Sequence, residues 1–155
     1  MAASSAGERL NLGPIAVVGV SDRKGQFGAY VVRELRKRGY TVHPVHPTLS
    51  KYDDQPVFAS LTDIPGEVDL VVVTVKPEKA MPVVVEAKAK GVKRIWFQQG
   101  ADFTEAAAAA REAGLETIDR ACVLMYADPV DGIHTFHRMV WKLIGAYKKP
   151  NPLSV

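Results

Sequence analysis

The stretch Pro14-Ile15-Ala16-Val17-Val18-Gly19-Val20 decides how this chain folds. It is a short, continuous apolar run with a glycine near its end, and a polar loop follows it from Ser21 to Gly25. Apolar runs without alternation are typical of strands in parallel sheets, because helices cover both faces of such a sheet. We therefore predict a buried parallel strand at this point of the chain.

The residues after that loop complete a β-α-β unit. Phe27 to Arg38 has apolar residues at helical spacing, and Gly39 is placed to end the helix that this spacing predicts. A second strand is predicted over Thr41 to Val45, and His46-Pro47 ends it. The unit is the first sign of a parallel α/β sheet.

The alternation of strand and helix continues along the chain. Pro77 and Pro82 each suit the first turn of the next helix, and the sequence leaves both starting points open. Asp102 and Glu105 have the spacing of a capping box, which predicts a helix that continues to Gly114. Further strands are predicted over 69–75, 93–97 and 115–118, and a last helix over 132–147.

This order of elements defines the expected fold class and domain organisation. Alternating strands and helices specify a parallel sheet with right-handed crossovers. We expect an α/β protein with a three-layer Rossmann-like fold, a parallel sheet of about five strands and helices on both faces. Residues 1–13 are interpreted as a flexible N-terminal arm, 14–149 as the domain and 150–155 as a C-terminal tail.

Length and composition exclude several classes of protein. A chain of 155 residues fits one domain, and 47% hydrophobic residues argue against disorder. The net charge of +3 comes without a long basic run, so we expect no nucleic-acid partner. The single cysteine, Cys122, excludes an intramolecular disulfide and a thiolate metal cluster. No apolar run reaches the length of a membrane span, and residues 1–9 lack the apolar core of a secretory signal, so we expect a cytoplasmic protein.

The loop between the first strand and the first helix has the chemistry of an anion site. Main-chain N–H groups at a helix N-terminus attract phosphates, and glycines allow a phosphate to approach the main chain. A hydroxyl and two cations stand in the same loop. The alternative is a glycine turn that only packs the helix on the strand. The predicted contacts are Gly19, Val20, Ser21, Arg23, Lys24, Gly25, Phe27 and Gly28.

The loops after the other strands are expected to complete the site, because ligands of such sheets bind outside the carboxyl ends of the strands. His46 is suited to stack on a base or to contact a phosphate; alternatively, it is merely exposed at a strand end. The glutamines after the fourth strand suit hydrogen bonds to a polar, uncharged ligand arm; alternatively, they form a simple turn. The predicted contacts are Val45, His46, Pro47, Val75, Lys76, Pro77, Gln98, Gln99 and Gly100.

Several other kinds of site are disfavoured. The dinucleotide fingerprint G-x-G-x-x-G is absent, because Ser21 stands two residues after Gly19. The second strand ends in His46 rather than in the acid that would bind an NAD ribose. His134 and His137 are spaced to share a metal, but no other ligand is evident, and we predict none. We also find no catalytic constellation and therefore expect no enzyme, and we interpret Cys122 as a small buried hydrophobe.

Eight short pieces of the chain, taken in order, resemble the small stand-alone CoA-binding proteins. Those proteins are similar to the N-terminal, CoA-binding domain of the succinyl-CoA synthetase α subunit. The resemblance extends over roughly residues 14–123. The pieces are Val18-Gly19-Val20-Ser21, Gly39-Tyr40-Thr41-Val42, Pro44-Val45-His46-Pro47, Val68-Asp69-Leu70-Val71, Gly91-Val92-Lys93, Trp96-Phe97-Gln98-Gln99-Gly100, Gly114-Leu115 and Asp119-Arg120-Ala121-Cys122.

The resemblance implies a Rossmann-like fold that holds CoA. The loop from Gly19 to Gly28 would meet the CoA phosphates, Val45-His46-Pro47 would border the nucleotide, and the later strand ends would line the groove. The chain departs from the family pattern at His46, where the family usually has Asn, and at Ala121, which is inserted before Cys122. The synthetase carries its phosphorylated histidine in a later domain, so the resemblance brings no catalysis with it.

Three functional hypotheses follow. The first is a cytoplasmic module that binds CoA or a short acyl-CoA and acts as a carrier, a sensor or a regulatory subunit. The alternative from another class is an NAD(P)-dependent oxidoreductase or a nucleotide-linked transferase. The third is an interaction protein that forms a homodimer or meets a partner enzyme through the last helix, whose apolar face is wide.

Overall fold

The computed structural model describes residues 12–21, 23 and 26–126. Five strands form one parallel sheet in the order β2-β1-β5-β6-β7, which confirms the expected α/β class. The predicted last helix and the C-terminal tail lie outside the described residues, as does nearly all of the N-terminal arm. The sheet strands are β1 (Ile15–Val18), β2 (Val42–Val45), β5 (Leu70–Val73), β6 (Arg94–Gln98) and β7 (Glu116–Ala121).

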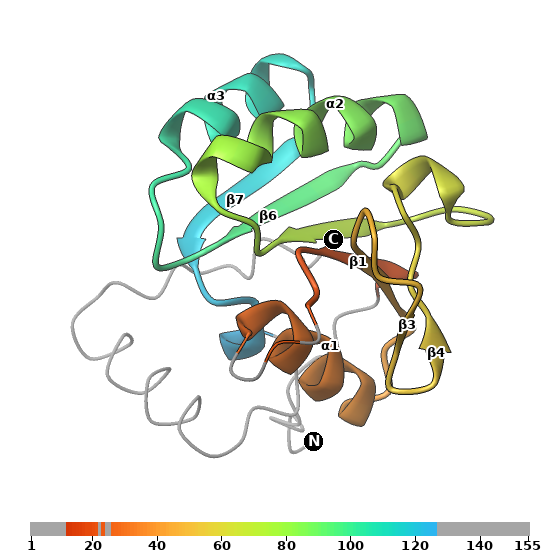
Figure 1. Ribbon diagram of the computed structural model, residues 1–155. Helices are drawn as coiled ribbons and strands as arrows, with labels where there is room; N and C mark the ends of the chain where they lie inside the picture. Colours follow the sequence, from red (N-terminus) through yellow and green to blue (C-terminus); the bar gives the residue numbers. More distant parts are fainter. Residues whose placement is uncertain (1–11, 22, 24–25, 127–155) are drawn as a thin grey trace, which may run out of the picture.

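Helices cover both faces of the sheet and make three layers (Figure 1). Alternate side chains of a strand point to opposite faces, and the two faces accordingly belong to two separate cores. Ile15 and Val17 of β1 pack into the core below α1, whereas Ala16 and Val18 pack into the core below α2 and α3. The helices are α1 (Phe27–Lys37), α2 (Ala80–Lys90) and α3 (Thr104–Glu112).

The starts of α2 and α3 refine the sequence predictions. Pro77 opens a 3₁₀ turn, Pro77–Lys79, and α2 begins directly after it at Ala80. The predicted capping box before α3 is wrong. Asp102 Oδ1 instead accepts hydrogen bonds from the main-chain N–H and the hydroxyl of Thr104, at 3.0 and 2.6 Å. These bonds hold the pKa of the Asp102 carboxyl below its ordinary value.

The long connection between β2 and β5 protects the outer edge of the sheet. It contains a small hairpin, β3 (Lys51–Tyr52) and β4 (Gln55–Pro56), that the sequence did not predict. The apolar piece after the hairpin lies along β2, where Phe58 donates to Pro44 O and accepts from His46 N–H, both at 3.0 Å. An edge strand that is paired in this way no longer exposes its free hydrogen-bonding groups.

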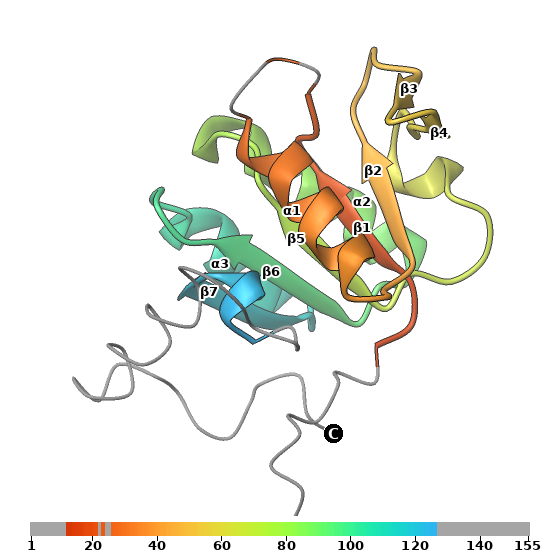
Figure 2. The same cartoon turned by 90° about the horizontal axis from the view of Figure 1, so that it is seen from below.

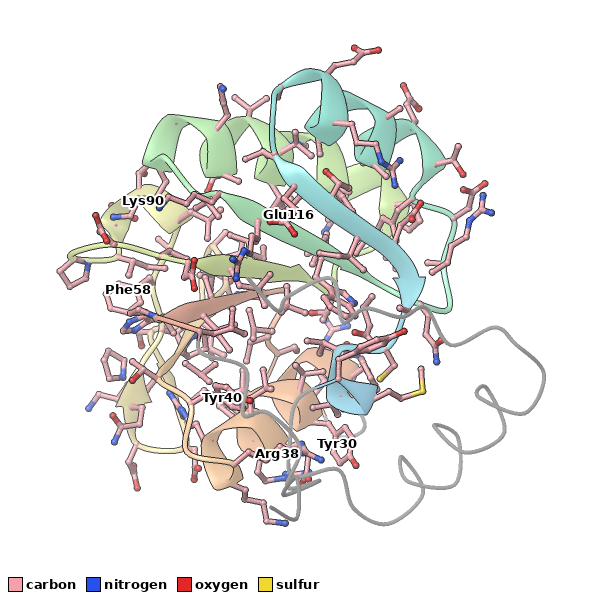
Figure 3. The ribbon with its side chains drawn as sticks, turned by 180° about the vertical axis from the view of Figure 1, so that it is seen from behind. Tyr30, Arg38, Tyr40, Phe58, Lys90 and Glu116 are labelled. Carbon is pink, nitrogen blue, oxygen red and sulfur yellow. The ribbon has the colours of Figure 1, made fainter. Side chains whose placement is uncertain are left out.

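The last two turns of α2 hold the rest of this connection. Glu86 Oε2 accepts from the main-chain N–H of Leu61 at 3.0 Å, and Lys90 Nζ donates to Ile64 O. Figure 3 shows Lys90 beside this connection, on the side of the sheet away from Arg38 and Tyr40. In the part of the chain that the structure describes, no helix is long and apolar enough to cross a membrane.

Two glycines allow β1, α1 and β5 to meet closely at the end of β1. Gly19 has φ +109°, and a Cβ at Gly28 would lie 2.6 Å from Gly19 O and from Thr74 Oγ1. Thr74 Oγ1 donates to Val18 O at 2.8 Å, so its hydroxyl is fixed at this point. Gly28 is therefore required for packing the helix on the strand, which is the role that the sequence analysis left as the alternative.

We expect the substitution Gly28→Ala to lower the free energy of unfolding by about 1–3 kcal/mol, because the new methyl group overpacks a site bounded by main chain. Urea unfolding followed by circular dichroism measures the change. Gly13→Ala is the matched control, because Gly13 does not have a positive φ and its Cβ would meet only the side chain of Asp69, at 3.3 Å, and no main chain. Equal stability of Gly28→Ala and the wild type would contradict the packing role.

Candidate functional site

A pocket of about 480 Å³ lies at the carboxyl edge of the sheet, where β1, β2 and β5 end. Figure 2 shows that α1 begins at the end of the sheet toward which β2 points. The pocket is lined by Val18, Gly19, Ser21, Arg23, Gln26, Val45, His46, Pro47, Thr48, Thr74, Val75, Lys76 and Lys79. Three of the four loops expected to form a site therefore meet in one place.

The N-terminus of α1 stands beside this pocket, because its N-cap residue, Gln26, is one of the lining residues. Ser21 Oγ accepts from the main-chain N–H of Arg23 at 3.3 Å, and Gln26 N–H donates to Arg23 O at 3.3 Å. Among the described residues, no side chain caps α1, and its first turn holds no acid. The first N–H groups of a helix have no partner within the helix and carry its positive dipole end, so they are suited to an anion.

The charged side chains of the pocket are all basic in the part of the chain that the structure describes. Arg23 comes from the loop after β1, and Lys76 and Lys79 come from the start of the segment after β5. All three are exposed, so their charges reach solvent and can approach a ligand. Cations converging on an uncapped helix N-terminus favour a phosphorylated ligand.

His46 holds the turn that follows β2. Its Nδ1 accepts from the main-chain N–H of Thr48 at 3.3 Å and of Leu49 at 3.1 Å. The ring is half-buried and belongs to the lining of the pocket. His46 is therefore built into the local structure and is not merely exposed at a strand end.

Some predicted site residues lie elsewhere. Val20 is buried in the core on the α1 side, and Gly28 packs against β1 as described above. Phe27 is 42% exposed and Pro77 is exposed, but neither lines the pocket. Lys24 and Gly25 lie outside the described residues.

The loop after β6 does not join this pocket. Gly100 lines a separate open hollow of about 520 Å³ together with Asp102, Asp119 and Arg120. Gln99, the residue before it, is half-buried and lines neither hollow. The pocket at the ends of β1, β2 and β5 is therefore separate from the strand ends of β6 and β7.

Gln98 points into the core and not toward the edge of the sheet. It is 4% exposed, and its Oε1 accepts from the main-chain N–H of Val123 at 3.1 Å. Cys122 is buried beside it, as the sequence analysis expected. Burial raises the pKa of the Cys122 thiol, although hydrogen bonds from the Gln98 side chain and from main-chain groups of Leu124 and Met125 act in the opposite direction.

A bulge interrupts the pairing of β7 with β6 shortly before Cys122. Trp96 pairs with Ile118 and Gln98 pairs with Ala121, so β7 holds two residues opposite the single residue Phe97 of β6. One of the two, Arg120, has φ +56°. A bulge of this kind re-aims the side chains beyond it.

Sequence reasoning missed five residues of the pocket: Val18, Gln26, Thr48, Thr74 and Lys79. Thr74 is the polar residue within an apolar strand run, and this break in the pattern was a usable signal. Lys79 follows Lys76 by three residues, which is one turn of the 3₁₀ segment that starts at Pro77. Gln26 and Thr48 carry no signal without the fold, because exposed polar residues are normal in loops.

The fold and the pocket together define a doubly wound α/β protein with a candidate site for a phosphorylated ligand. The chain belongs to the CoA binding domain family, whose model matches residues 14–128. Among the described residues, no group of three His, Cys, Asp or Glu side chains could hold a metal ion.

Similar proteins are of two kinds. The uncharacterized protein YneT of Bacillus subtilis is 32% identical over 109 residues, which cover 70% of this chain and 81% of YneT. The ADP-forming acetate–CoA ligase II of Archaeoglobus fulgidus is 35% identical over 82 residues, which cover 51% of this chain but 12% of the ligase. A solved structure, a hypothetical protein from Pyrococcus horikoshii OT3, has a TM-score of 0.72 at 32% identity and covers 79% of this chain and 86% of its own.

The thiol of Cys122 is expected to make stability depend on pH in alkaline solution. Because burial raises its folded pKa above the unfolded value of about 8.5, its contribution is present below that pH and is lost above it. As the pH is raised from neutral to alkaline, we expect urea unfolding to show a larger loss of stability for the wild type than for Cys122→Ala. Parallel pH profiles of the two proteins would contradict a thiol that titrates in this way.

Proposed function

We propose that this chain binds CoA or a short acyl-CoA in the pocket at the ends of β1, β2 and β5. It would act as a carrier, a sensor or a regulatory subunit, without catalysis of its own. The observation that carries the proposal is that Arg23, Lys76 and Lys79 line one pocket together with Gln26, the N-cap residue of α1, which has no side-chain cap among the described residues. Membership of the CoA binding domain family supports the choice of CoA over other phosphorylated ligands.

The pocket residues fit the diphosphate end of CoA. The N–H groups of the first turn of α1 would receive the pyrophosphate, and Ser21 would add a hydroxyl. Gly19 lines the pocket at the end of β1. Val45, Pro47 and Val75 would supply apolar and main-chain surface next to the nucleotide.

The thiol end of the ligand would run along the edge of the sheet toward β6 and β7. The hollow at Gly100, Asp119 and Arg120 lies at the ends of those strands and is open to solvent. Neighbouring strands are about 4.8 Å apart, so crossing from β1 to β6 requires about 10 Å, which a pantetheine arm can span. Gln98 would not contact the arm, since its amide is held inside the core.

The similarity to ligases indicates what kind of partner the chain would have in our proposal. The match covers 12% of an acetate–CoA ligase and 12% of a 4-hydroxybutyrate–CoA ligase. In our proposal the chain corresponds to the CoA-binding segment of such enzymes. A separate enzyme could then use it as a CoA-holding subunit, and a homodimer is the other arrangement that we consider.

Thermal unfolding with CoA, acetyl-CoA, NAD, NADP and ATP in parallel tests the proposal. A ligand at about 100 times its dissociation constant stabilises a protein by about 2.7 kcal/mol, which corresponds to a shift of roughly 5–10 °C here. We expect this shift with CoA or acetyl-CoA. A shift with NAD or NADP alone would favour the oxidoreductase alternative, and no shift with any ligand would contradict binding by the isolated chain.

The substitution Lys76→Ala is expected to weaken CoA binding by about three- to tenfold, because it removes one of the cations that face the phosphates. Isothermal titration calorimetry at two salt concentrations measures the loss, which shrinks as salt screens the exposed charges. Lys93→Ala is the matched control, since Lys93 is an exposed lysine before β6, at the opposite edge of the sheet. Equal losses in both variants would mean that net charge, and not the pocket, governs binding.

A further inference from the structure

The ring of His46 presents two different nitrogens to its surroundings. Nδ1 accepts from the main-chain N–H groups of Thr48 and Leu49, at 3.3 and 3.1 Å. A main-chain N–H is always a donor, so Nδ1 carries no proton, and in a neutral imidazole the proton then lies on Nε2. Within the described residues Nε2 has no hydrogen-bond partner, and His46 is one of the residues that line the pocket. One side of the ring therefore holds the chain, and the other offers a donor.

The place of His46 in the fold indicates which part of a ligand it meets. It is the first residue after β2, and in doubly wound sheets the residue at the end of this strand contacts the ribose of a nucleotide. In NAD-binding sheets that residue is an acid, which accepts a hydrogen bond from a ribose hydroxyl. His46 has the opposite polarity, because its available atom donates. A donor at this point suits the oxygens of a phosphate attached to the ribose.

The charge of the pocket agrees with an additional phosphate. A phosphate monoester adds about −1.5 to −2 charge at pH 7. The lining residues that the structure describes include three cations, Arg23, Lys76 and Lys79, and no acid. This excess of positive charge favours a ligand with more phosphate than a pyrophosphate alone.

We propose that His46 makes the pocket select CoA over ligands that lack the 3′-phosphate on the ribose. Nδ1 positions the turn over residues 46–49, and Nε2–H donates a hydrogen bond to the 3′-phosphate. The inference rests on the proposed function, that the pocket binds CoA. It concerns a residue at which this chain departs from the Asn that the resembling family usually carries.

Two substitutions separate the roles of the two nitrogens. In His46→Asn, Oδ1 takes the place of Nδ1 and continues to accept from the turn, but the Nε2–H donor is lost. His46→Ala removes both. Calorimetric titration of the wild type and both variants with CoA and with dephospho-CoA measures the preference for the 3′-phosphate, and thermal unfolding without ligand measures the effect on the turn.

We expect the wild type to prefer CoA, and His46→Asn to lower this preference about tenfold, with little change in dephospho-CoA affinity or in the unfolding temperature. His46→Ala should also weaken dephospho-CoA binding, because the turn loses its acceptor. His43→Asn is the matched control, since His43 packs against Phe58 with ring centroids 5.5 Å apart and does not line the pocket. The control should keep the wild-type preference.

Three outcomes would overturn the inference. If His46→Asn keeps the full preference for CoA, the role of His46 is structural only. If the wild type binds CoA and dephospho-CoA equally, no selection exists, while the proposed function stands. If the wild type binds no CoA, or instead binds NADP in preference to NAD through His46, the proposed function and this inference both fail.

Discussion

The close contact between β1, α1 and β5 is the constraint on which the rest of the site depends. Thr74 anchors the end of β1 by donating to Val18 O at 2.8 Å, and Gly19 and Gly28 have no side chains at the places where that hydroxyl and the two main chains meet. This packing aims the N-terminus of α1 along the carboxyl edge of the sheet. The direction of the helix dipole, and with it the preference for an anion, is therefore a consequence of core packing.

Around that contact, short local bonds shape the three loops of the pocket. Ser21 turns the chain after β1 through the N–H of Arg23, His46 turns the chain after β2, and a proline starts the 3₁₀ turn after β5. Each of these local structures extends over only a few residues, and each places a cation or a hydrogen-bond donor at the carboxyl edge of the sheet. The cationic side chains remain exposed, so little free energy is lost by desolvating them. Their positive potential extends to the place where a phosphate would bind.

Most features that depend on neighbouring residues were predicted from the sequence, whereas contacts between distant parts of the chain were not. The parallel strands, the helix that begins at Phe27 and the contribution of Gly19, Ser21, Arg23, His46 and Lys76 to one pocket were predicted, because apolar runs and polar loop residues mark them locally. Gln98 was misplaced. A glutamine at a strand end looks available for a ligand, and only the bulge of β7 and the following turn bring the N–H of Val123 to it at 3.1 Å. The capping box failed for a local reason instead, because Asp102 accepts hydrogen bonds from Thr104, two residues further along the chain.

By itself, the sequence determined the fold class. The strands are apolar on both faces and alternate with helices, and a parallel sheet between two layers of helices buries such strands. The sequence also determined the chemistry available in each loop. Only the tertiary structure decided which loops share a pocket, that Gly28 serves packing, and which nitrogen of His46 stays free. The physical reason is that hydrophobic burial is non-directional and shows in composition and pattern, whereas hydrogen bonds and close approaches depend on positions that exist only after the strands are aligned.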